Sequence, residues 1–189
     1  MEMIAATNNN HKLKEIREIL SQIGCEIFSL NDVCIHIDIE ETGATFEENA
    51  LIKARQICKL TGQISIADDS GLEVKELDGK PGVFSARYAG VDGEEKDKAN
   101  NKKLLDEMKD IPIEKRNARF CSVIAIVFPD GREITAKGYI KGIIGFEEKG
   151  DNGFGYDPLF IIDGLDKTMA ELKIEEKNKI SHRARQMNK

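Results

Sequence analysis

The chain contains no tryptophan, and its four cysteines (Cys25, Cys34, Cys58 and Cys121) never form a C-x-x-C pair. Scattered cysteines argue against a zinc site or a disulfide framework, because both need grouped thiols. No apolar run approaches the length of about 20 residues that a transmembrane helix requires, and Met1 to Thr7 does not resemble a signal peptide. These absences predict reduced thiols, a cytoplasmic location and no membrane partner.

The chain also lacks a surplus of positive charge. It carries 28 Lys and Arg against 34 Asp and Glu, for a net charge of −6, which argues against a general nucleic-acid binder. With 189 residues, 40% of them hydrophobic and 33% charged, the chain is long enough for one globular domain with a real core. We find no repeat or linker, and a second small lobe is compatible with this length.

The most informative segment runs from Ile64 to Gly71. Ile64, Ile66 and Ala67 are typical of a buried strand, and the run ends in two carboxylates, a serine and a glycine. Because side chains alternate across a strand, Asp68 and Asp69 are expected to point in opposite directions, one toward a cleft and the other toward backbone donors or a base. A cleft carboxylate can hold a divalent metal or accept a proton from water. The alternative is an ordinary polar strand-to-turn junction.

The first sixty residues predict two further units. An apolar opening up to Ala6 leads through the polar residues 7–12 into a segment with Leu13, Ile16, Leu20 and Ile23 at helical spacing. This strand–loop–helix order offers an anion site at the helix start, although simple capping by Asn or Thr explains the same residues. A helix from Phe46 to about Leu60 follows an acidic turn with Glu40 and Glu41, which either binds a metal, complements the helix dipole or is solvated.

The second half predicts a hairpin and a glycine-rich loop. Residues 118–128 and 133–140 read as strands around the turn signal Pro129-Asp130-Gly131, so the sheet should be mixed, and residues 96–108 read as a helix. In residues 150–158, glycines flank Phe154 and allow close backbone approach, with aromatics that either stack on a flat ring or plug the core. The basic cluster near the C-terminus either binds a base or phosphate, or is a solvated helix.

Together these segments resemble the inosine triphosphate pyrophosphatase family, which hydrolyses non-canonical purine nucleoside triphosphates. The resemblance covers essentially the whole chain, with the motifs in the same order. They are Thr7-x-Asn9-x-x-Lys12, Glu41-Thr42-Gly43, Thr45-Phe46-x-Glu48-Asn49-Ala50 with Lys53-Ala54, Ala67-Asp68-Asp69-Ser70-Gly71-Leu72, residues 81–88 (PGVFSARY), Gly153-Phe154-Gly155-Tyr156-Asp157-Pro158, Glu176-Lys177 and Ser181-His182-Arg183.

The resemblance implies an α/β fold for residues 1–189, with a long mixed β-sheet flanked by helices and two lobes around a central substrate cleft. It implies that Asp69 is the catalytic acid/base and a metal ligand, with Glu41 as the second metal carboxylate and Glu40 as its rival. Implied substrate-binding residues are Thr7, Asn8, Asn9, Asn10, His11, Lys12, Lys53, Ser70, Phe154, Gly155, Tyr156, Asp157, Lys177, His182 and Arg183.

The same resemblance implies a reaction. Water activated by Asp69 would attack the α-phosphorus, with Mg²⁺ as cofactor and lysines steadying the leaving pyrophosphate. Phe154 would stack on the purine, and Lys177, His182 and Arg183 would donate to a 6-oxo group, which disfavours adenine because its amino group would be left unpaired. The family also implies a homodimer. Alternatives are a pyrophosphatase for pyrimidine or other nucleotides, a non-catalytic nucleotide sensor and a nucleic-acid-binding module.

Overall fold

The computed structural model of the chain describes residues 1–173 and 176–177. Its sheet has six strands in the order β2-β1-β3-β4-β5-β6. Strand β1 (Glu2–Ala5) pairs in parallel with β2 (Glu26–Ser29) and with β3 (Ser65–Val74), whereas β5 (Glu133–Ile144) pairs antiparallel with β6 (Phe160–Ile162). The predicted mixed sheet with flanking helices is therefore confirmed.

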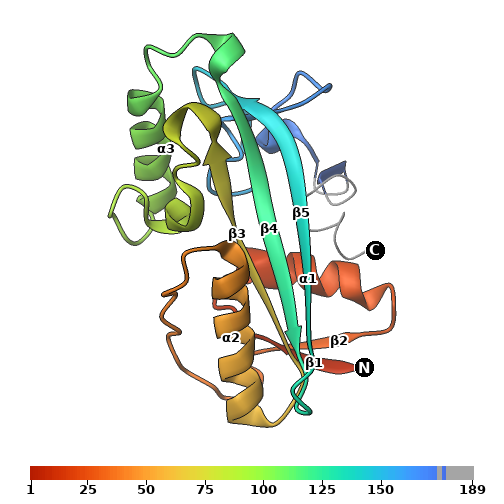
Figure 1. The fold of residues 1–189 in the computed structure, drawn as a ribbon. Coiled ribbons are helices and arrows are strands. Elements are labelled where there is room, and N and C mark those ends of the chain that lie inside the picture. Colours follow the sequence, from red (N-terminus) through yellow and green to blue (C-terminus); the bar gives the residue numbers. More distant parts are fainter. Residues whose placement is uncertain (174–175, 178–189) are drawn as a thin grey trace. The chain divides into compact units, whose positions relative to one another are not determined.

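The chain divides into two compact units, which we describe separately. The first contains Met1–Asp69 and Ser122–Gly138, and the second contains Ser70–Cys121 together with the described residues from Tyr139 onward. Strand β4 (Asn117–Val127) and strand β5 belong partly to each unit and are joined by a tight turn at residues 128–132 (Figure 1). No helix among the described residues is long and apolar enough to cross a membrane.

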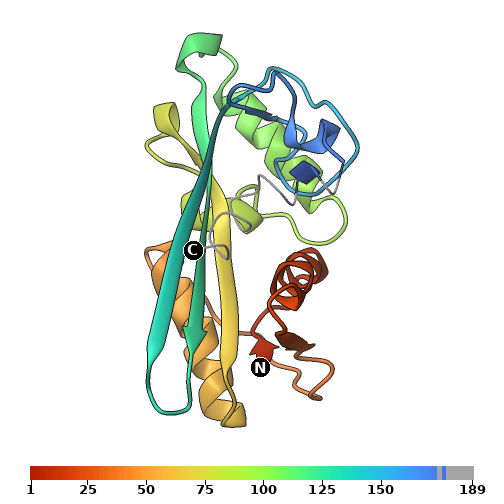
Figure 2. The same ribbon diagram turned by 90° about the vertical axis from the view of Figure 1, so that its right-hand side faces the viewer.

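In the first unit, helix α1 (Asn10–Ser21) and helix α2 (Phe46–Thr61) cover opposite faces of the parallel strands (Figure 2). Leu13, Ile16 and Leu20 on α1 pack with Met3 and other apolar side chains of the sheet in one core cluster, whereas the predicted fourth position, Ile23, follows the end of the helix and is exposed. Helix α2 begins with the predicted capping box between Thr45 and Glu48 and ends at Gly62 in the left-handed conformation that glycine tolerates. The unit thus follows the strand–helix–strand order that the sequence predicts.

The second unit has its own core. Leu72, Leu104, Met108, Phe120 and Phe160 are among the side chains that form it, with Phe120 and Phe160 in ring contact. Helix α3 (Lys96–Glu107) lies in this unit, and short 3-10 turns occupy Lys75–Leu77, Gly82–Arg87, Ile113–Lys115 and Met169–Glu171. Because each unit contains a core cluster of its own, each unit can position its own functional side chains.

The structure corrects two expectations. Strand β3 does not end at the two carboxylates but continues through them to Val74, because Leu72 and Val74 are themselves buried in the second core. The spacing of Ala99, Leu105 and Met108 predicts that these three form the apolar face of the helix, but α3 buries Asn100, Asn101 and Leu104, while Ala99 and Leu105 are half-buried and the buried Met108 follows the last helical residue. The sequence pattern missed this polar face because buried asparagines carry no apolar periodicity.

Candidate functional site

The first cluster of polar side chains surrounds the ammonium of Lys53, a buried residue of helix α2 in the first unit. Its Nζ donates to Glu41 Oε1 at 2.6 Å, to Asp69 Oδ1 at 2.8 Å and to the backbone oxygen of Asp68 at 3.0 Å. Lys53 is 8% exposed and Asp69 is 5% exposed, so two carboxylates and a lysine share a site with little solvent. We call Glu41, Lys53 and Asp69 the carboxylate cluster.

Local structure explains how Glu41 reaches this cluster. The start of helix α2 holds the segment before it, because Asn49 Oδ1 accepts a hydrogen bond from the Gly43 N–H at 2.8 Å. A side chain at Gly43 would place its Cβ 2.7 Å from that oxygen, so only glycine fits this approach. Asn49 is fully buried and was not among the predicted site residues, although the sequence motif did contain it.

The electrostatics of the carboxylate cluster favour a base at Asp69. Burial raises the pKa of Asp69 above its usual range, and the charge of Glu41 adds to the rise, while Lys53 and Lys12 oppose it. Burial acts to lower the pKa of Lys53, but the charges of Asp69 and Glu41 outweigh it and raise that pKa. Lys53 is thus a permanent cation, and Asp69 is a carboxylate whose affinity for a proton is higher than that of an ordinary aspartate.

Asp68 points away from Asp69, as strand alternation predicts. Its Oδ2 lies 2.9 Å from Lys12 Nζ and its Oδ1 accepts the hydroxyl of Ser122 at 2.5 Å, and the side chain is fully buried. The loop lysine of residues 7–12 is therefore anchored to the strand that carries Asp69. The same loop confirms the capping alternative, because the Asn9 side chain accepts the N–H groups of His11 and Lys12 at the start of α1.

The second cluster lies in the second unit, on the loop of residues 153–157, which we call the glycine–aromatic loop. Asp157 Oδ2 accepts the Phe154 N–H at 3.1 Å and the Lys177 ammonium at 2.6 Å. That ammonium also lies 5.1 Å from the centre of the half-buried Phe154 ring. Lys177 and Asp157 are 8% and 5% exposed, so the loop is held by a nearly buried ion pair.

The two aromatics of this loop have different environments. Tyr156 is 4% exposed, belongs to the second core, and donates its hydroxyl hydrogen to the Ser85 backbone oxygen at 2.9 Å. Phe154 is only half-buried. Of the two alternatives for these aromatics, plugging the core describes Tyr156, whereas Phe154 lies at the partly exposed edge of the loop beside the Lys177 ammonium.

The predicted residues thus fall into three groups. The first unit brings Glu41 and Asp69 together on Lys53, and it also contains Lys12 and the loop residues Thr7, Asn8, Asn9, Asn10 and His11. The second unit holds Ser70 at its start and brings together Phe154, Gly155, Tyr156, Asp157 and Lys177. His182 and Arg183 lie outside the described residues.

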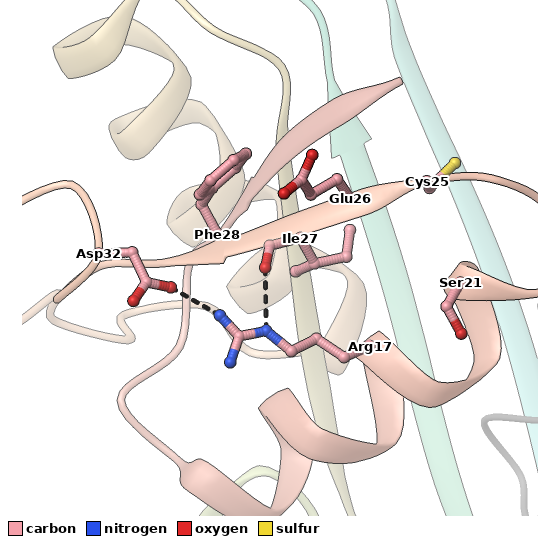
Figure 3. Close-up of a pocket in the computed structure, with 7 residues that line it drawn as sticks. All are labelled: Arg17, Ser21, Cys25, Glu26, Ile27, Phe28 and Asp32. Carbon is pink, nitrogen blue, oxygen red and sulfur yellow. Dashed lines mark hydrogen bonds and ion pairs between the residues drawn. The ribbon is translucent and has the colours of Figure 1, made fainter.

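A separate surface pocket of about 570 Å³ lies between α1 and β2 (Figure 3). Arg17 crosses it, donating from Nε to the Ile27 backbone oxygen at 2.9 Å and from Nη2 to Asp32 at 2.6 Å. Asp32 also accepts the Ser29 N–H, so the charged groups of Arg17 and Asp32 both serve to hold the local structure. None of the predicted site residues lines this pocket, and it belongs to the packing of the edge strand.

Comparison with known proteins identifies the family. The model of the Ham1 family matches residues 3–189. The chain belongs to the Ham1 family. It is 49% identical over 188 residues to a Bacillus subtilis protein named dITP/XTP pyrophosphatase, covering 100% of this chain and 94% of that protein, and 52% identical over 188 residues to a Bacillus licheniformis protein of the same name, covering 100% and 95%.

A solved structure agrees. The Ham1 protein of Staphylococcus aureus superposes with a TM-score of 0.87 at 42% identity, covering 100% of this chain and 95% of that one. The resemblance that the motifs indicated is therefore confirmed at the level of family and fold. Asp68, Ser122 and Asn49, which support the predicted residues of this Ham1 chain, were not predicted as site residues, although strand alternation did predict that one of the two aspartates is held by backbone donors or by a base.

Proposed function

We propose that this protein hydrolyses non-canonical purine nucleoside triphosphates, such as dITP and XTP, to the nucleoside monophosphate and pyrophosphate. This removes them from the nucleotide pool before they enter DNA or RNA. The observation that carries the proposal is the convergence of Glu41 and Asp69 on one buried lysine, in a chain about half identical to proteins named dITP/XTP pyrophosphatase. Convergent carboxylates beside lysines are the side chains that phosphoryl transfer requires.

The proposed cofactor is Mg²⁺, and the residues present fit it. Among the residues that the structure describes, no group of three or more His, Cys, Asp or Glu forms a metal site. Mg²⁺ does not need such a cage, because it commonly binds through one or two carboxylates, substrate phosphates and water. Glu41 and Asp69 already gather around a cation, and they are the residues that would hold it. When bound, Mg²⁺ would neutralise charge on the phosphate oxygens.

The roles of the chain's own residues follow from the geometry. Asp69, with its raised pKa, would accept the proton of the attacking water. Lys12 and Lys53 would bind the phosphates and stabilise the leaving pyrophosphate, with the polar groups of residues 7–11 and Ser70 as further contacts. Attack at the α-phosphorus then releases pyrophosphate intact.

Recognition of the base would belong to the glycine–aromatic loop. Phe154 would stack on the purine, and Gly155, Tyr156 and Asp157 would shape its pocket. Lys177, with His182 and Arg183, would donate to the 6-oxo group of hypoxanthine or xanthine. Adenine offers a donor at that position, and an unpaired donor in a buried site costs about 1–3 kcal/mol. We propose that the two units serve one substrate, as two lobes of a single domain.

We also propose that the protein acts in the cytoplasm as a homodimer and forms no stable complex with nucleic acid or membrane. The four cysteines form no disulfide, which supports the cytoplasmic location. The acidic charge balance supports the absence of a nucleic-acid complex, and the family resemblance supports the dimer. Light scattering on the purified protein tests the dimer: a monomeric mass at micromolar concentration would contradict it.

The experiment that tests the function is a substrate panel with Mg²⁺, comparing dITP, ITP, XTP, ATP, GTP and a pyrimidine triphosphate. We expect pyrophosphate from ITP, dITP and XTP and little from ATP. Turnover that is fastest with the pyrimidine would favour the rival pyrophosphatase class. Binding of dITP without turnover of any triphosphate would make the protein a nucleotide sensor.

A further inference from the structure

Two side chains of helix α3 hold the backbone of a single residue in the glycine–aromatic loop. Asp97 Oδ2 accepts the Gly155 N–H at 2.7 Å, and Asn101 Nδ2 donates to the Gly155 carbonyl at 3.1 Å. Asp97 and Asn101 are four residues apart, so they lie on one face of the helix. The helix thereby fixes both polar groups of one backbone residue, between Phe154 and Tyr156.

The conformation of Gly155 explains why such support is needed. Its φ of +62° lies in the left-handed region, and its neighbour Gly153 has a φ of +91°. A loop built on such residues has wide conformational freedom, because glycine adopts many other backbone conformations at no steric cost. Hydrogen bonds at both ends of Gly155 remove much of that freedom and therefore set the direction in which the Phe154 side chain leaves the chain.

An asparagine at position 101 lowers the stability of the protein. It is 2% exposed, and among the described residues its Oδ1 accepts no hydrogen bond. A buried, unsatisfied amide oxygen is less favourable than an apolar side chain of similar shape. Stability alone would favour leucine here, so the one contact that justifies the amide is its donation to Gly155.

The neighbouring residue extends the same support. Asn100 Oδ1 accepts the Ala89 N–H at 2.7 Å, and its Nδ2 donates to the Ser85 carbonyl at 3.3 Å. The Tyr156 hydroxyl donates to that same carbonyl. Consecutive asparagines of α3 thus connect the glycine–aromatic loop with the turn Gly82–Arg87, and the helix acts as a frame for the loop.

We propose that Asp97 and Asn101 are positioning residues for recognition of the base, which act through Gly155 to orient Phe154 in the free enzyme. The inference rests on the proposed function, because the loop is taken to bind the purine. Neither Asp97 nor Asn101 is proposed to touch the phosphates of the substrate. Their loss should therefore weaken binding of the base and leave binding of the phosphate chain unchanged.

The test compares Asp97→Leu and Asn101→Leu with the wild type in two calorimetric titrations, one with the nucleoside monophosphate dIMP and one with inorganic tripolyphosphate, which has no base. We expect each variant to weaken dIMP binding about tenfold, the effect of about one lost hydrogen bond, with tripolyphosphate binding unchanged. In turnover of dITP, KM should rise by a similar factor and kcat should stay within about twofold.

Two controls separate positioning from structure. Asp97→Asn keeps an oxygen that can accept the Gly155 N–H and should restore dIMP binding to near the wild-type value. Lys98→Ala changes the adjacent side chain, which is 80% exposed and pairs with Glu95 at 3.7 Å, and should change nothing. A merely structural role predicts a lower melting temperature for Asn101→Leu, whereas the positioning role predicts an unchanged or higher one together with weaker dIMP binding.

Any of three results would overturn the inference: unchanged dIMP binding in both leucine variants, equal weakening of dIMP and tripolyphosphate binding, or absence of dIMP binding by the wild type. Absence of turnover by a wild type that binds dIMP would overturn the proposed function alone, because both titrations measure binding without chemistry.

Discussion

Lys53 Nζ lies 2.6 Å from Glu41 Oε1 and 2.8 Å from Asp69 Oδ1, so one ammonium is shared by the two carboxylates proposed to hold the metal. All three side chains are held within the first unit, and Lys53 is positioned by the capped helix α2. The lysine thus keeps two acids together that would otherwise repel each other. A divalent cation between the same acids would do likewise, which makes the relationship testable.

Replacing Lys53 with methionine should destabilise the protein and make it responsive to metal. Removing one partner of a buried ion pair costs about 3–5 kcal/mol, and here two carboxylates lose their shared cation. We expect a lower melting temperature for Lys53→Met, with a larger upward shift on addition of millimolar MgCl₂ than the wild type shows. The matched control is Lys59→Met, at an exposed position of the same helix. Equal Mg²⁺ shifts in all three proteins would contradict this reading.

Asp69→Asn should lose catalysis without losing stability. General-base catalysis contributes about 10²–10⁴ in rate, so we expect kcat to fall by at least about 100-fold. Because the folded state raises the pKa of Asp69, folding favours the protonated form, and the ionised carboxylate costs stability above that pKa. A neutral amide avoids this cost, so thermal melting at neutral pH should show no decrease. Wild-type turnover by this variant would remove Asp69 from the mechanism.

Asp68→Asn should affect the phosphate end of the substrate. Asp68 fixes Lys12 at 2.9 Å, and Lys12 is proposed to grip the phosphates. We expect weaker binding of inorganic tripolyphosphate, by about tenfold, with dIMP binding unchanged, measured by calorimetry. Ser122→Ala, which removes one hydrogen bond to the same carboxylate, should cost about 1 kcal/mol of unfolding free energy. If Asp68→Asn weakened dIMP instead, Lys12 would not be the phosphate contact.

Gly153→Ala should disable the glycine–aromatic loop. The new Cβ would lie 3.0 Å from Lys177 Nζ and even closer to Asp157, whose ion pair with Lys177 holds the loop. We expect kcat/KM for dITP to fall by about tenfold or more. Gly164→Ala is the matched control, because Gly164 has a similar φ of +80° but no neighbouring atom within 4 Å of the added Cβ. Equal losses in both variants would show that backbone strain alone, and not the ion pair, is responsible.

The sequence predicted most of the fold because its signals were local. The helical spacing of Leu13, Ile16 and Leu20 and the capping box of Thr45 correspond to α1 and α2, and all these elements are observed. The predicted end of strand β3 was wrong, because the residues from Asp68 to Gly71 are typical of a turn. Whether polar residues continue a strand depends on partners far along the chain, here Ser122 and Lys12 for Asp68, which a local pattern does not contain.

The residues of the site were likewise predicted only in part, because some of its contacts join distant parts of the chain. Motif positions indicated Glu41, Lys53 and Asp69. In the structure, each of the two carboxylates accepts a hydrogen bond from the Lys53 ammonium. The roles of Asp97 and Asn101 could not be predicted, because they contact a residue more than fifty positions away. A signal was present in the spacing of two polar residues at i and i+4, but such pairs are common on exposed helix faces.

The measurement that tests the central claim most directly is hydrolysis of dITP in isotopically labelled water, followed by mass spectrometry of both products. Attack at the α-phosphorus, as the arrangement of Asp69 and the lysines predicts, places the heavy oxygen in the nucleoside monophosphate and none in pyrophosphate. Label in pyrophosphate would mean attack at the β-phosphorus, and labelled orthophosphate would mean attack at the γ-phosphorus. Either result would contradict the proposed reaction.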